Sequence, residues 1–427
     1  MYNTQDKKEK ALLVVVSVKP EKETWTEEEI AAELKILVES TGIEVVEVMS
    51  VHLKEISAGR YIGKGKCEEI AELAQGLDID VVIFNNNLTA TQQRNLEDIV
   101  GVKTIDRTQL ILDIFAAHAH TQEGALQVEL AQLEYLLPRL KGKGIMLSRL
   151  GGGIGTRGPG ERKIEIDRRR IDERITRLRK ELENVRKHRD TIRKKRQKEQ
   201  VQVCSLVGYT NAGKSTLLNT LTGAGRETSD SLFTTLDPVS RTFTFDNHLQ
   251  IVITDTVGFI YKLPPYLVES FKATLEELQY ADLLLHVVDV SNENYPKLIK
   301  AVDEILKDLE LNEKHQLLIF NKIDRLSDAE IERMQVKYPE AILVSALTRA
   351  NVSELLAEIQ KILFVDNKTV WVTFNFAEMK ILDWLYRHAS VIKVNYTAEH
   401  VEVKTVIKND LISSLEKKGA QIKEIER

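Results

Sequence analysis

Apolar and polar positions alternate in blocks through the first part of the chain. Four short apolar runs, ALLVVVSV, EVVEVMSV, DVVIFN and VKTID, are separated by stretches of helical spacing near residues 25–40, 66–75, 90–99 and 108–120. Strands that alternate with helices are typical of a parallel sheet covered by helices. Thr26 followed by Glu29 also predicts a capping box at the start of the first helix. We therefore predict a small α/β domain over residues 1–120.

Two longer helical patterns follow, and each repeats apolar residues at alternating steps of four and three. The positions are Leu126, Leu130, Leu133, Leu137 and Leu140 in the first pattern and Ile171, Ile175, Leu178, Leu182 and Val185 in the second. Such spacing places one narrow apolar seam on each helix, as in a coiled coil. We predict an antiparallel helical hairpin over residues 121–200, with a tip loop at 141–160.

The tip loop is rich in glycine and in positive charge. The segment LKGKGIMLSRLGGGIGTRGPGE contains eight glycines and four basic residues, and its only acidic residue is the last one. The following stretch, 161–200, has seventeen basic and nine acidic residues, although the whole chain has a formal net charge of −5. A basic segment on an acidic protein favours contact with a polyanion such as folded RNA, and a solvated charged helix with a plain linker is the alternative.

Beyond residue 200 the pattern changes to an apolar strand, a glycine-rich loop and a helix. VQVCSLV is followed by GYTNAGKS at 208–215 and then by STLLNTLTG. A GxxxxGK[ST] loop between a strand and a helix binds phosphates through backbone N–H groups and the helix N-terminus. We expect Lys214 to reach the β- and γ-phosphates and the Ser215 hydroxyl to bind Mg²⁺.

Three further segments have the order of a guanine-nucleotide switch. ITDTVGF ends an apolar strand at Asp255, which can hold the Mg²⁺ shell while the Gly258 amide meets the γ-phosphate. NKID follows the strand QLLIF, and the Asp324 carboxylate can accept two hydrogen bonds from the N1–H and 2-amino groups of guanine. Adenine lacks these donors, so the sequence predicts GTP rather than ATP.

The switch threonine and the residue after DTVG bear on hydrolysis. SLFTTLDP offers Thr234 and Thr235 for the Mg²⁺-binding switch threonine, and the similar FTTL of Obg-type GTPases favours Thr235. Phe259 stands where Ras-like enzymes have a glutamine that orients the attacking water, which predicts slow intrinsic hydrolysis. Asn211 either helps to bind a potassium ion or only bonds within its loop.

These motifs define the candidate site residues. The predicted catalytic residues are Lys214, Thr235 and Gly258, and the predicted Mg²⁺ ligands are Ser215, Thr235 and Asp255. The predicted nucleotide-binding residues are Gly208, Tyr209, Thr210, Asn211, Ala212, Gly213, Lys214, Ser215, Phe233, Thr234, Thr235, Leu236, Asp237, Asp255, Thr256, Val257, Gly258, Asn321, Lys322, Ile323, Asp324, Ser345, Ala346 and Leu347. The predicted RNA-binding residues are Lys141, Lys143, Arg149, Arg157, Arg162 and Lys163.

The remaining observations complete the predicted organisation. A nucleotide-binding domain at 201–365 is followed by a small α+β domain at 366–427, where we interpret Trp371, Trp384 and Tyr386 as packing residues. The composition is that of a globular protein, and no apolar run approaches eighteen residues. No cleavable signal pattern follows the polar N-terminus, so we expect a cytoplasmic protein. We also expect a monomer. Cys67 and Cys204 have neither disulfide nor zinc spacing.

Several segments together resemble HflX-type GTPases over most of the chain. They are DRTQLILDIFAAHAHTQEGALQVELAQLEYLLPRL, GGGIGTRGPGE, FTTLDP, DTVGFIYKLPPYLVESFKATLEE and ADLLLHVVDVS. The resemblance implies a multidomain α/β protein with a P-loop GTPase domain that binds the large ribosomal subunit. It also implies an arm that reaches towards the peptidyl transferase centre, and a GTPase that splits stalled or idle ribosomes.

The resemblance leaves open how this member is used. Where the family commonly reads ETQLE after the tip, this chain has Glu161, Arg162, Lys163, Ile164 and Glu165, which adds positive charge. A tip near the peptidyl transferase centre would also lie near antibiotic sites, so a protective role is one hypothesis. A GTPase for assembly of the large subunit and a GTP-gated RNA-binding module with negligible turnover are the alternatives.

Overall fold

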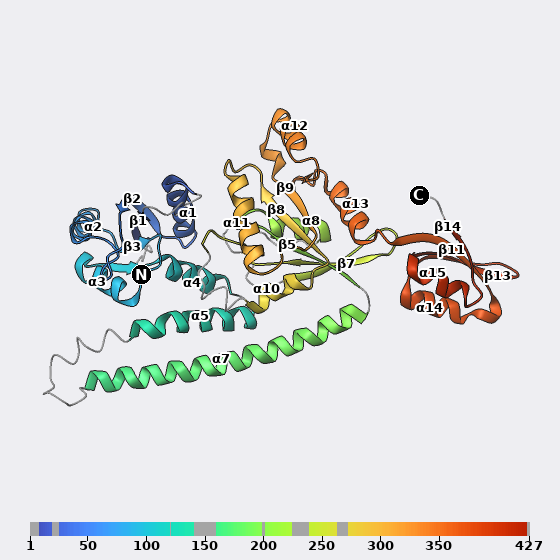
Figure 1. Ribbon diagram of the computed structural model, residues 1–427, viewed down its shortest axis with the longest axis horizontal. Coiled ribbons are helices and arrows are strands. Elements are labelled where there is room, and N and C mark those ends of the chain that lie inside the picture. The colour runs from blue at the N-terminus through green and yellow to red at the C-terminus, as the bar shows by residue number, and fades with distance from the viewer. Residues whose placement is uncertain are drawn as a thin grey trace, which may run out of the picture.

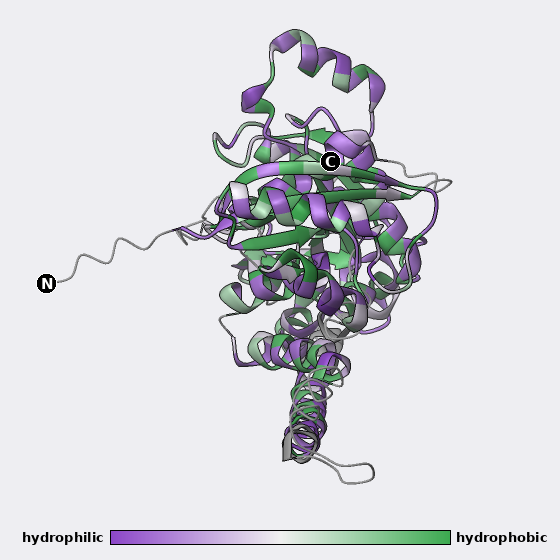
Figure 2. Ribbon diagram, turned by 90° about the vertical axis from the view of Figure 1, so that its left-hand side faces the viewer, coloured by the Kyte–Doolittle hydropathy of each residue, from purple (hydrophilic) through white to green (hydrophobic). Residues whose placement is uncertain are grey.

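The computed structural model describes residues 8–18, 25–119, 121–140, 159–198, 201–223, 239–262 and 272–424. Three β-sheets follow one another along the longest axis of the molecule, and a pair of helices runs beside the first two (Figure 1). The strands are coloured mostly as hydrophobic and the helices are striped with hydrophilic residues, as expected for sheets buried under amphipathic helices (Figure 2).

The N-terminal sheet is parallel, with the strand order β2-β1-β3-β4. Its elements are β1 (Lys10–Val18), α1 (Glu27–Glu39), β2 (Glu44–Leu53), α2 (Lys64–Gly76), β3 (Val81–Phe84), α3 (Ala90–Val100), β4 (Lys103–Ile105) and α4 (Arg107–His118). Residues Leu12 and Leu13 of β1 belong to different apolar clusters, one on each face of the sheet. Burial on both faces explains the continuous apolar runs, and the predicted parallel sheet is confirmed.

Local signals at the ends of the N-terminal helices are also confirmed. The backbone N–H of Thr26 donates to Oε2 of Glu29 over 2.7 Å, and the Glu29 N–H donates to the Thr26 hydroxyl. The glycine-rich segment RYIGKGK forms a turn into a helix, with Tyr61 at a φ of 68° and Gly63 as the N-cap of α2.

The helical pair consists of α5 (Gln122–Leu140) and α7 (Pro159–Lys198). The end of α5 and the start of α7 lie at the same end of the pair, so the two helices are antiparallel (Figure 1). Their shared apolar seam contains Leu126, Leu130, Leu133, Leu137, Ile171, Ile175, Leu178 and Leu182. The predicted hairpin is confirmed, and its outer edges carry ion pairs such as Arg174 to Glu129 at 2.6 Å. We call this pair the arm.

The central sheet has six strands in the order β10-β9-β8-β5-β7-β6, and only the edge strand β6 is antiparallel to its neighbour. Its elements are β5 (Gln202–Val207), α8 (Lys214–Thr222), β6 (Val239–Thr244), β7 (Gln250–Asp255), α10 (Lys272–Gln279), β8 (Leu283–Asp289), α11 (Tyr295–Asp308), β9 (Gln316–Asn321), η1 (Ile323–Arg325), α12 (Asp328–Lys337), β10 (Ile342–Leu343) and α13 (Val352–Leu363). Cys204 on β5 is fully buried, as expected for a core residue. The segments GYTNAGKS, DTVGF and NKID each follow the carboxyl end of a parallel strand, so they lie at one edge of the sheet.

The C-terminal sheet is antiparallel, with the order β12-β13-β11-β14. Its elements are β11 (Asn367–Asn375), η2 (Phe376–Glu378), α14 (Lys380–His388), β12 (Ser390–Tyr396), β13 (His400–Lys408), α15 (Asn409–Glu416) and β14 (Gln421–Glu424). The α+β prediction is confirmed, although β14 was not predicted, because Ile422 is its only apolar residue. Trp384 packs against the core of this domain, but the prediction that Tyr386 packs is wrong, since Tyr386 is 63% exposed.

The C-terminal sheet contacts the central sheet at the β6–β7 edge. Val406 and Ile392 pack into the same apolar cluster as Phe245 and Phe364. In the part of the chain that the structure describes, no helix is long and apolar enough to cross a membrane.

Candidate functional site

The phosphate loop, residues 208–213, joins β5 to α8 and needs glycine at two positions. Gly213 has a φ of 89°, and a Cβ there would lie 2.3 Å from Nδ2 of Asn321. A Cβ at Gly208 would lie 2.2 Å from the carbonyl oxygen of Val287 on β8. A side chain at either position would therefore displace a neighbouring strand or amide, so glycine lets the loop pack closely on the sheet.

Lys214 is the first residue of α8 and lies within the curve of the phosphate loop. It is 6% exposed, and its Nζ donates to the carbonyl oxygens of Gly208 at 3.1 Å and Tyr209 at 2.9 Å. Burial lowers the pKa of Lys214 to about 8, although nearby Asp255 acts against this shift. The N-terminus of α8 has no side-chain cap hydrogen bond, and helix N-termini bind phosphates through the N–H groups of the first turn. A cation and a helix N-terminus therefore lie together here.

Two of the predicted Mg²⁺ ligands meet beside Lys214. The Ser215 hydroxyl donates to Oδ2 of Asp255 over 2.6 Å, and Asp255 is 1% exposed at the end of β7. Mg²⁺ binds oxygen ligands, usually one or two protein groups together with phosphates and waters. A hydroxyl and a carboxylate at hydrogen-bond distance therefore fit this ion. The third predicted ligand, Thr235, lies outside the described residues.

Asn321 links the phosphate loop to both segments that are predicted to bind the base. Its Nδ2 donates to the carbonyl oxygen of Ala212 at 2.9 Å, and its Oδ1 accepts from the N–H of Ala346 at 2.9 Å. Asn321 is 2% exposed, so these bonds are shielded from water. The asparagine thus fixes the spacing between the phosphate end and the base end of the site.

Asp324 and Lys322 occupy the base end. The Ser345 hydroxyl donates to Oδ1 of Asp324 at 2.5 Å, which orients the carboxylate that is predicted to read guanine. Lys322 has a φ of 68°, and its Nζ contacts the carbonyl oxygen of Asn211 at 2.8 Å and a carboxylate oxygen of Asp289 at 2.7 Å. Among the predicted nucleotide-binding residues at 345–347, Leu347 has a side chain that is 77% exposed.

The DTVGF segment lies directly against the phosphate loop. The Phe259 N–H donates to the carbonyl oxygen of Gly208 at 3.1 Å, and the Thr210 N–H donates to that of Phe259 at 2.9 Å. A Cβ at Gly258 would lie 3.2 Å from Nζ of Lys214, so Gly258 borders the lysine. The Phe259 ring is 1% exposed and packs with Val207 in an apolar cluster, where it offers no polar group to a water molecule.

The N-terminal part of the chain contacts this site through buried polar groups. The Tyr209 hydroxyl in the phosphate loop hydrogen-bonds Glu33 on α1 and accepts from the Tyr261 N–H at 2.8 Å. The Arg107 guanidinium donates to Glu33 at 2.8 Å and to the carbonyl oxygen of Tyr261 at 2.8 Å. Burial, followed by the charge of Glu33, raises the pKa of Tyr209 well above its usual value, so its hydroxyl stays protonated. We call these four residues, with Trp25 stacked on Tyr261 at 4.7 Å, the N-terminal joint.

Sequence reasoning missed several residues of this neighbourhood. Asp289 ends the apolar strand LLLHVVD, and its position at a strand end was the available signal. His286 lies three residues earlier on the same strand and is 3% exposed, and its pKa is lowered to about 4 by burial and then by Lys214. Glu33 and Arg107 carried no signal, because each sits in an ordinary helical pattern far from the loop in sequence.

Some predicted residues cannot be placed. Phe233, Thr234, Thr235, Leu236 and Asp237 lie outside the described residues, as do Lys141, Lys143, Arg149 and Arg157. Arg162 and Lys163 belong to α7, whose backbone is described there. The structure brings together the remaining nucleotide-binding candidates along the carboxyl edge of the central sheet.

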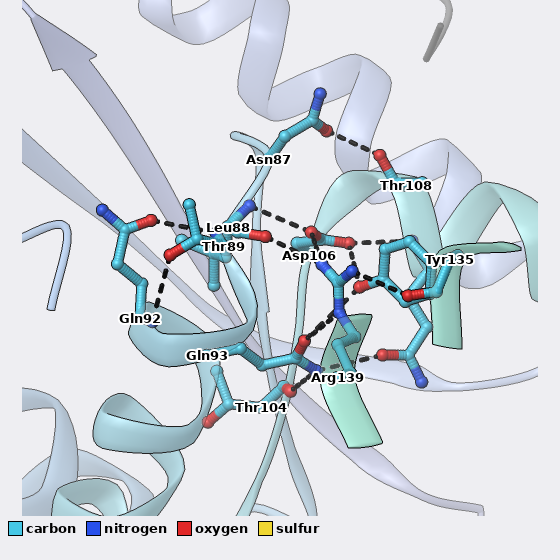
Figure 3. Close-up of polar contacts among 11 residues, drawn as sticks. Asn87, Leu88, Thr89, Gln92, Gln93, Thr104, Asp106, Thr108, Tyr135 and Arg139 are labelled. Carbon is cyan, nitrogen blue, oxygen red and sulfur yellow. Dashed lines mark hydrogen bonds and ion pairs between the residues drawn. The ribbon is translucent and has the colours of Figure 1, made fainter. Parts of the chain in front are cut away.

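The arm is anchored to the N-terminal sheet at its last described turn before the tip. Figure 3 shows Tyr135 and Arg139 of α5 converging on Asp106, which is fully buried at the end of β4. The Tyr135 hydroxyl donates to Asp106 at 2.8 Å, and Arg139 donates to Gln93 at 2.8 Å and to the carbonyl oxygen of Leu88 at 2.8 Å. Burial and the charge of Asp106 raise the pKa of Tyr135, so it remains a donor.

This network fixes the direction in which α5 ends. The Arg139 guanidinium also lies over the Tyr135 ring, 3.3 Å from its centroid, and pairs with Asp106 at 3.2 Å. An arginine with this many acceptors holds one rotamer, because any rotation would break several of these hydrogen bonds at once.

Comparisons with known proteins agree with the geometry. Three family models match the chain. Residues 28–116 match the model described as GTP-binding GTPase N-terminal, and residues 118–196 match GTP-binding GTPase Middle Region. Residues 203–322 match the model described as 50S ribosome-binding GTPase. A GTPase HflX of Caldanaerobacter subterraneus is 46% identical over 400 residues, covering 94% of this chain and 91% of the relative. The GTPase HflX of Escherichia coli is 42% identical over 357 residues and covers 83% of each chain.

Solved structures include similar chains of comparable length. A GTP-binding protein from Sulfolobus solfataricus in complex with GDP is 27% identical, with 83% of this chain and 98% of that chain covered and a TM-score of 0.43.

Proposed function

The chain belongs to the HflX family of GTPases, and we propose that it binds the large ribosomal subunit and dissociates stalled or idle ribosomes in the cytoplasm. The observation that carries this proposal is the arm, a stiff helical pair that continues into the basic, glycine-rich segment at 141–158. The family model that matches residues 203–322 is described as a 50S ribosome-binding GTPase, which supports the choice of partner.

We propose the following roles for the site residues. Lys214 exchanges its two carbonyl acceptors for oxygens of the β- and γ-phosphates, while the N–H groups of the phosphate loop and α8 bind the same phosphates. Asp324 accepts hydrogen bonds from guanine, and Asn321 keeps this carboxylate at a fixed distance from the loop. Ser215 and Asp255, with Thr235, would hold Mg²⁺, which supplies positive charge beside the phosphates.

Slow hydrolysis by the free protein follows from Phe259 and Gly258. The Gly258 amide can bond the γ-phosphate, because Gly258 borders Lys214, but the next side chain is buried in an apolar cluster. No group at that position orients the attacking water, so we expect the ribosome to reorder the switch segments and accelerate the reaction. Asn211, with a φ of 60° in the loop, is the residue that would help to bind a potassium ion.

The arm carries the contact with RNA in this proposal. The Arg139 network fixes the direction in which α5 ends, next to the basic residues Lys141 and Lys143. Phosphates provide affinity for such charges, and folded RNA is recognised by its shape. Replacing Lys141, Lys143, Arg149 and Arg157 with alanine should weaken binding to the subunit and flatten its salt dependence, while nucleotide affinity stays unchanged.

The decisive experiment measures GTP turnover with and without purified large subunits, together with sucrose-gradient profiles of mature ribosomes. We expect turnover to rise with subunits, and mature ribosomes to dissociate when the protein is added with a non-hydrolysable GTP analogue. Stimulation without dissociation would favour assembly of the large subunit instead. Absence of both would leave a GTP-gated RNA-binding module.

A further inference from the structure

The C-terminal domain has one sheet face without a helix of its own. Its chain order of strand, helix, two strands, helix and strand produces four antiparallel strands with both helices on the same face. Ile381, Leu385 and Leu415 of those helices pack with Val370 and Val372 of the central strand β11. Among the described residues, the apolar contact between the opposite face and the nucleotide-binding domain lies around Val406 and Ile392.

Trp371 lies on this second face. Val370 and Val372 are fully buried against the helices, and successive side chains of a strand point to opposite sides. Trp371 is half-buried and belongs to none of the apolar clusters formed by the described residues. Part of the Trp371 side chain is therefore exposed on this second face, outside the apolar core of the domain.

Three lysines flank Trp371 in a single row across all four strands. Trp371 is opposite Lys404 on β13 and Lys423 on β14, and Lys404 is opposite Lys393 on β12. Because neighbouring strands lie about 4.8 Å apart, the row spans roughly 15 Å. Within the described ranges, none of these lysines has an acidic side chain within ion-pair distance. Like charges on adjacent strands repel, so a polyanion would relieve an unfavourable arrangement.

The next row outward consists of polar groups that can bond base edges. It contains Asn395, Glu402, Thr373 and Gln421, and its one carboxylate contacts His400 on its own strand at 3.3 Å. Amides and hydroxyls both donate and accept, so they suit base edges without demanding one sequence.

We propose that this sheet face, which we call the Trp371 surface, binds a single-stranded segment of RNA. One base stacks on Trp371, and Lys393, Lys404 and Lys423 contact the phosphates. One known RNA-binding module is a four-stranded sheet that stacks bases on aromatic side chains, and Trp371 lies on the central strand β11 here. A duplex could not present a base face to the indole, since its bases are stacked on each other.

A protein partner fits this face less well. Protein interfaces are depleted in lysine and bury an apolar centre, whereas these two rows contain three lysines and one apolar side chain. The choice of RNA over DNA rests on the proposed function, while the stacking and charge of the surface do not depend on it.

The test uses the full-length protein and a fluorescein-labelled single-stranded oligouridine, with anisotropy as the measure of affinity. We expect Trp371→Ala to weaken binding about tenfold, the effect of losing one stacked base. Replacing Lys393, Lys404 and Lys423 together with alanine should lower the salt dependence of binding by a slope of about two, because single strands contribute about 0.7 per neutralised phosphate.

Matched controls separate this surface from general charge and from the arm. Tyr386→Ala removes an exposed aromatic residue from α14, and the triple change of Lys300, Lys307 and Lys417 to alanine removes the same charge from exposed positions elsewhere. Both should leave affinity within about twofold of the native value. Thermal unfolding of each variant checks that the sheet is intact. The variant Trp371→Phe keeps an aromatic ring for stacking, and it is compared with Trp371→Ala in case alanine disturbs the sheet.

Tryptophan fluorescence locates the bound RNA. The chain has three tryptophans, and stacking of a base should quench the emission of Trp371. We expect the oligonucleotide to quench the native protein and Tyr386→Ala, but not Trp371→Phe, which still binds.

Three outcomes would overturn the proposal. Native affinity in both Trp371→Ala and the lysine variant would place RNA binding elsewhere, for example on the arm. Loss of subunit binding with intact oligonucleotide binding would mean that the surface meets a protein. Tighter binding of the matching deoxyoligonucleotide would make the ligand DNA. Because the affinity for the oligonucleotide is measured without ribosomes, it is independent of subunit-stimulated turnover, on which the proposed function depends.

Discussion

The contacts that the central sheet and its helices make with the two neighbouring domains both contain apolar packing, but among the described residues only the N-terminal contact contains a buried ion pair. At the N-terminal joint, the Arg107 side chain is 4% exposed and binds both Glu33 and the backbone of Tyr261. At the C-terminal contact, apolar side chains around Val406 pack together, and the Ser390 hydroxyl donates to the carbonyl oxygen of Asn247 at 2.9 Å. We call the second contact the C-terminal joint.

The difference matters because only the N-terminal joint includes residues of the nucleotide site. Tyr209 belongs to the phosphate loop, and Tyr261 follows directly after DTVGFI. Buried hydrogen bonds depend steeply on distance and angle, so a shift of α1 would disturb both segments. Apolar packing at the β6–β7 edge is less directional and lies away from the phosphates. The N-terminal domain is therefore positioned to affect the nucleotide site, and the C-terminal domain is not.

The largest effect should come from breaking the buried ion pair. In Arg107→Ala, Glu33 keeps a buried charge without its cation, and the Tyr261 carbonyl loses a donor. We expect the free energy of unfolding to fall by about 3–5 kcal/mol, measured by urea denaturation. Arg174→Ala, which removes an exposed partner of Glu129, should cost about 0.2–1 kcal/mol. Equal losses in the two variants would mean that the ion pair of the N-terminal joint contributes no more than an exposed one.

The buried lysine beside the N-terminal joint makes nucleotide binding depend on pH. Lys214 has a pKa of about 8 in the free protein, below the usual value for lysine, so it loses its proton as the pH rises through that value. Phosphates need the charged form, and GTP affinity should fall up to about tenfold for each pH unit above the pKa. Titration calorimetry on either side of that pH measures the effect. The Lys214→Arg variant stays charged, so its GTP affinity should not fall over this pH range. A fall that persists in this variant would come from another titrating group.

The sequence was sufficient where the structure depends on short segments. The glycine-rich loop GYTNAGKS, the carboxylate of DTVGF and the NKID motif each lie at a strand end, so their placement at one sheet edge follows from the order of elements. The spacing of leucines and isoleucines likewise predicted the arm, because a seven-residue repeat fixes which faces of two helices meet.

The sequence was insufficient where contacts join distant positions. Glu33 and Tyr209 are 176 residues apart, and neither the helix EEEIAAELKILVE nor the loop contains a pattern that pairs them. Asp106 and Arg139 are also joined only by the fold. Such pairs depend on the packing of whole domains, which periodicity does not encode.

A smaller effect is expected from one hydroxyl of the N-terminal joint. Tyr209→Phe keeps the ring but removes the acceptor of the Tyr261 N–H and the donor to Glu33. The segment that carries Gly258 is then less firmly held, so GTP affinity should fall about three- to tenfold, while GDP affinity changes little. Fluorescent nucleotide titration compares the two. Tyr295→Phe, whose hydroxyl contacts Met334 and Lys337, is the matched control. Equal weakening of GTP and GDP would mean that Tyr209 only stabilises the loop.

The smallest effect should come from the C-terminal joint. Ser390→Ala removes the hydroxyl that donates to Asn247, but the apolar contact around Val406 stays in place. We expect a loss of about 0.5–1.5 kcal/mol in the free energy of unfolding and no change in the affinity for GTP or GDP. The same denaturation and titration measurements apply. A change in nucleotide affinity comparable to that of Tyr209→Phe would show that both joints reach the site, and the asymmetry between them would then lie in stability alone.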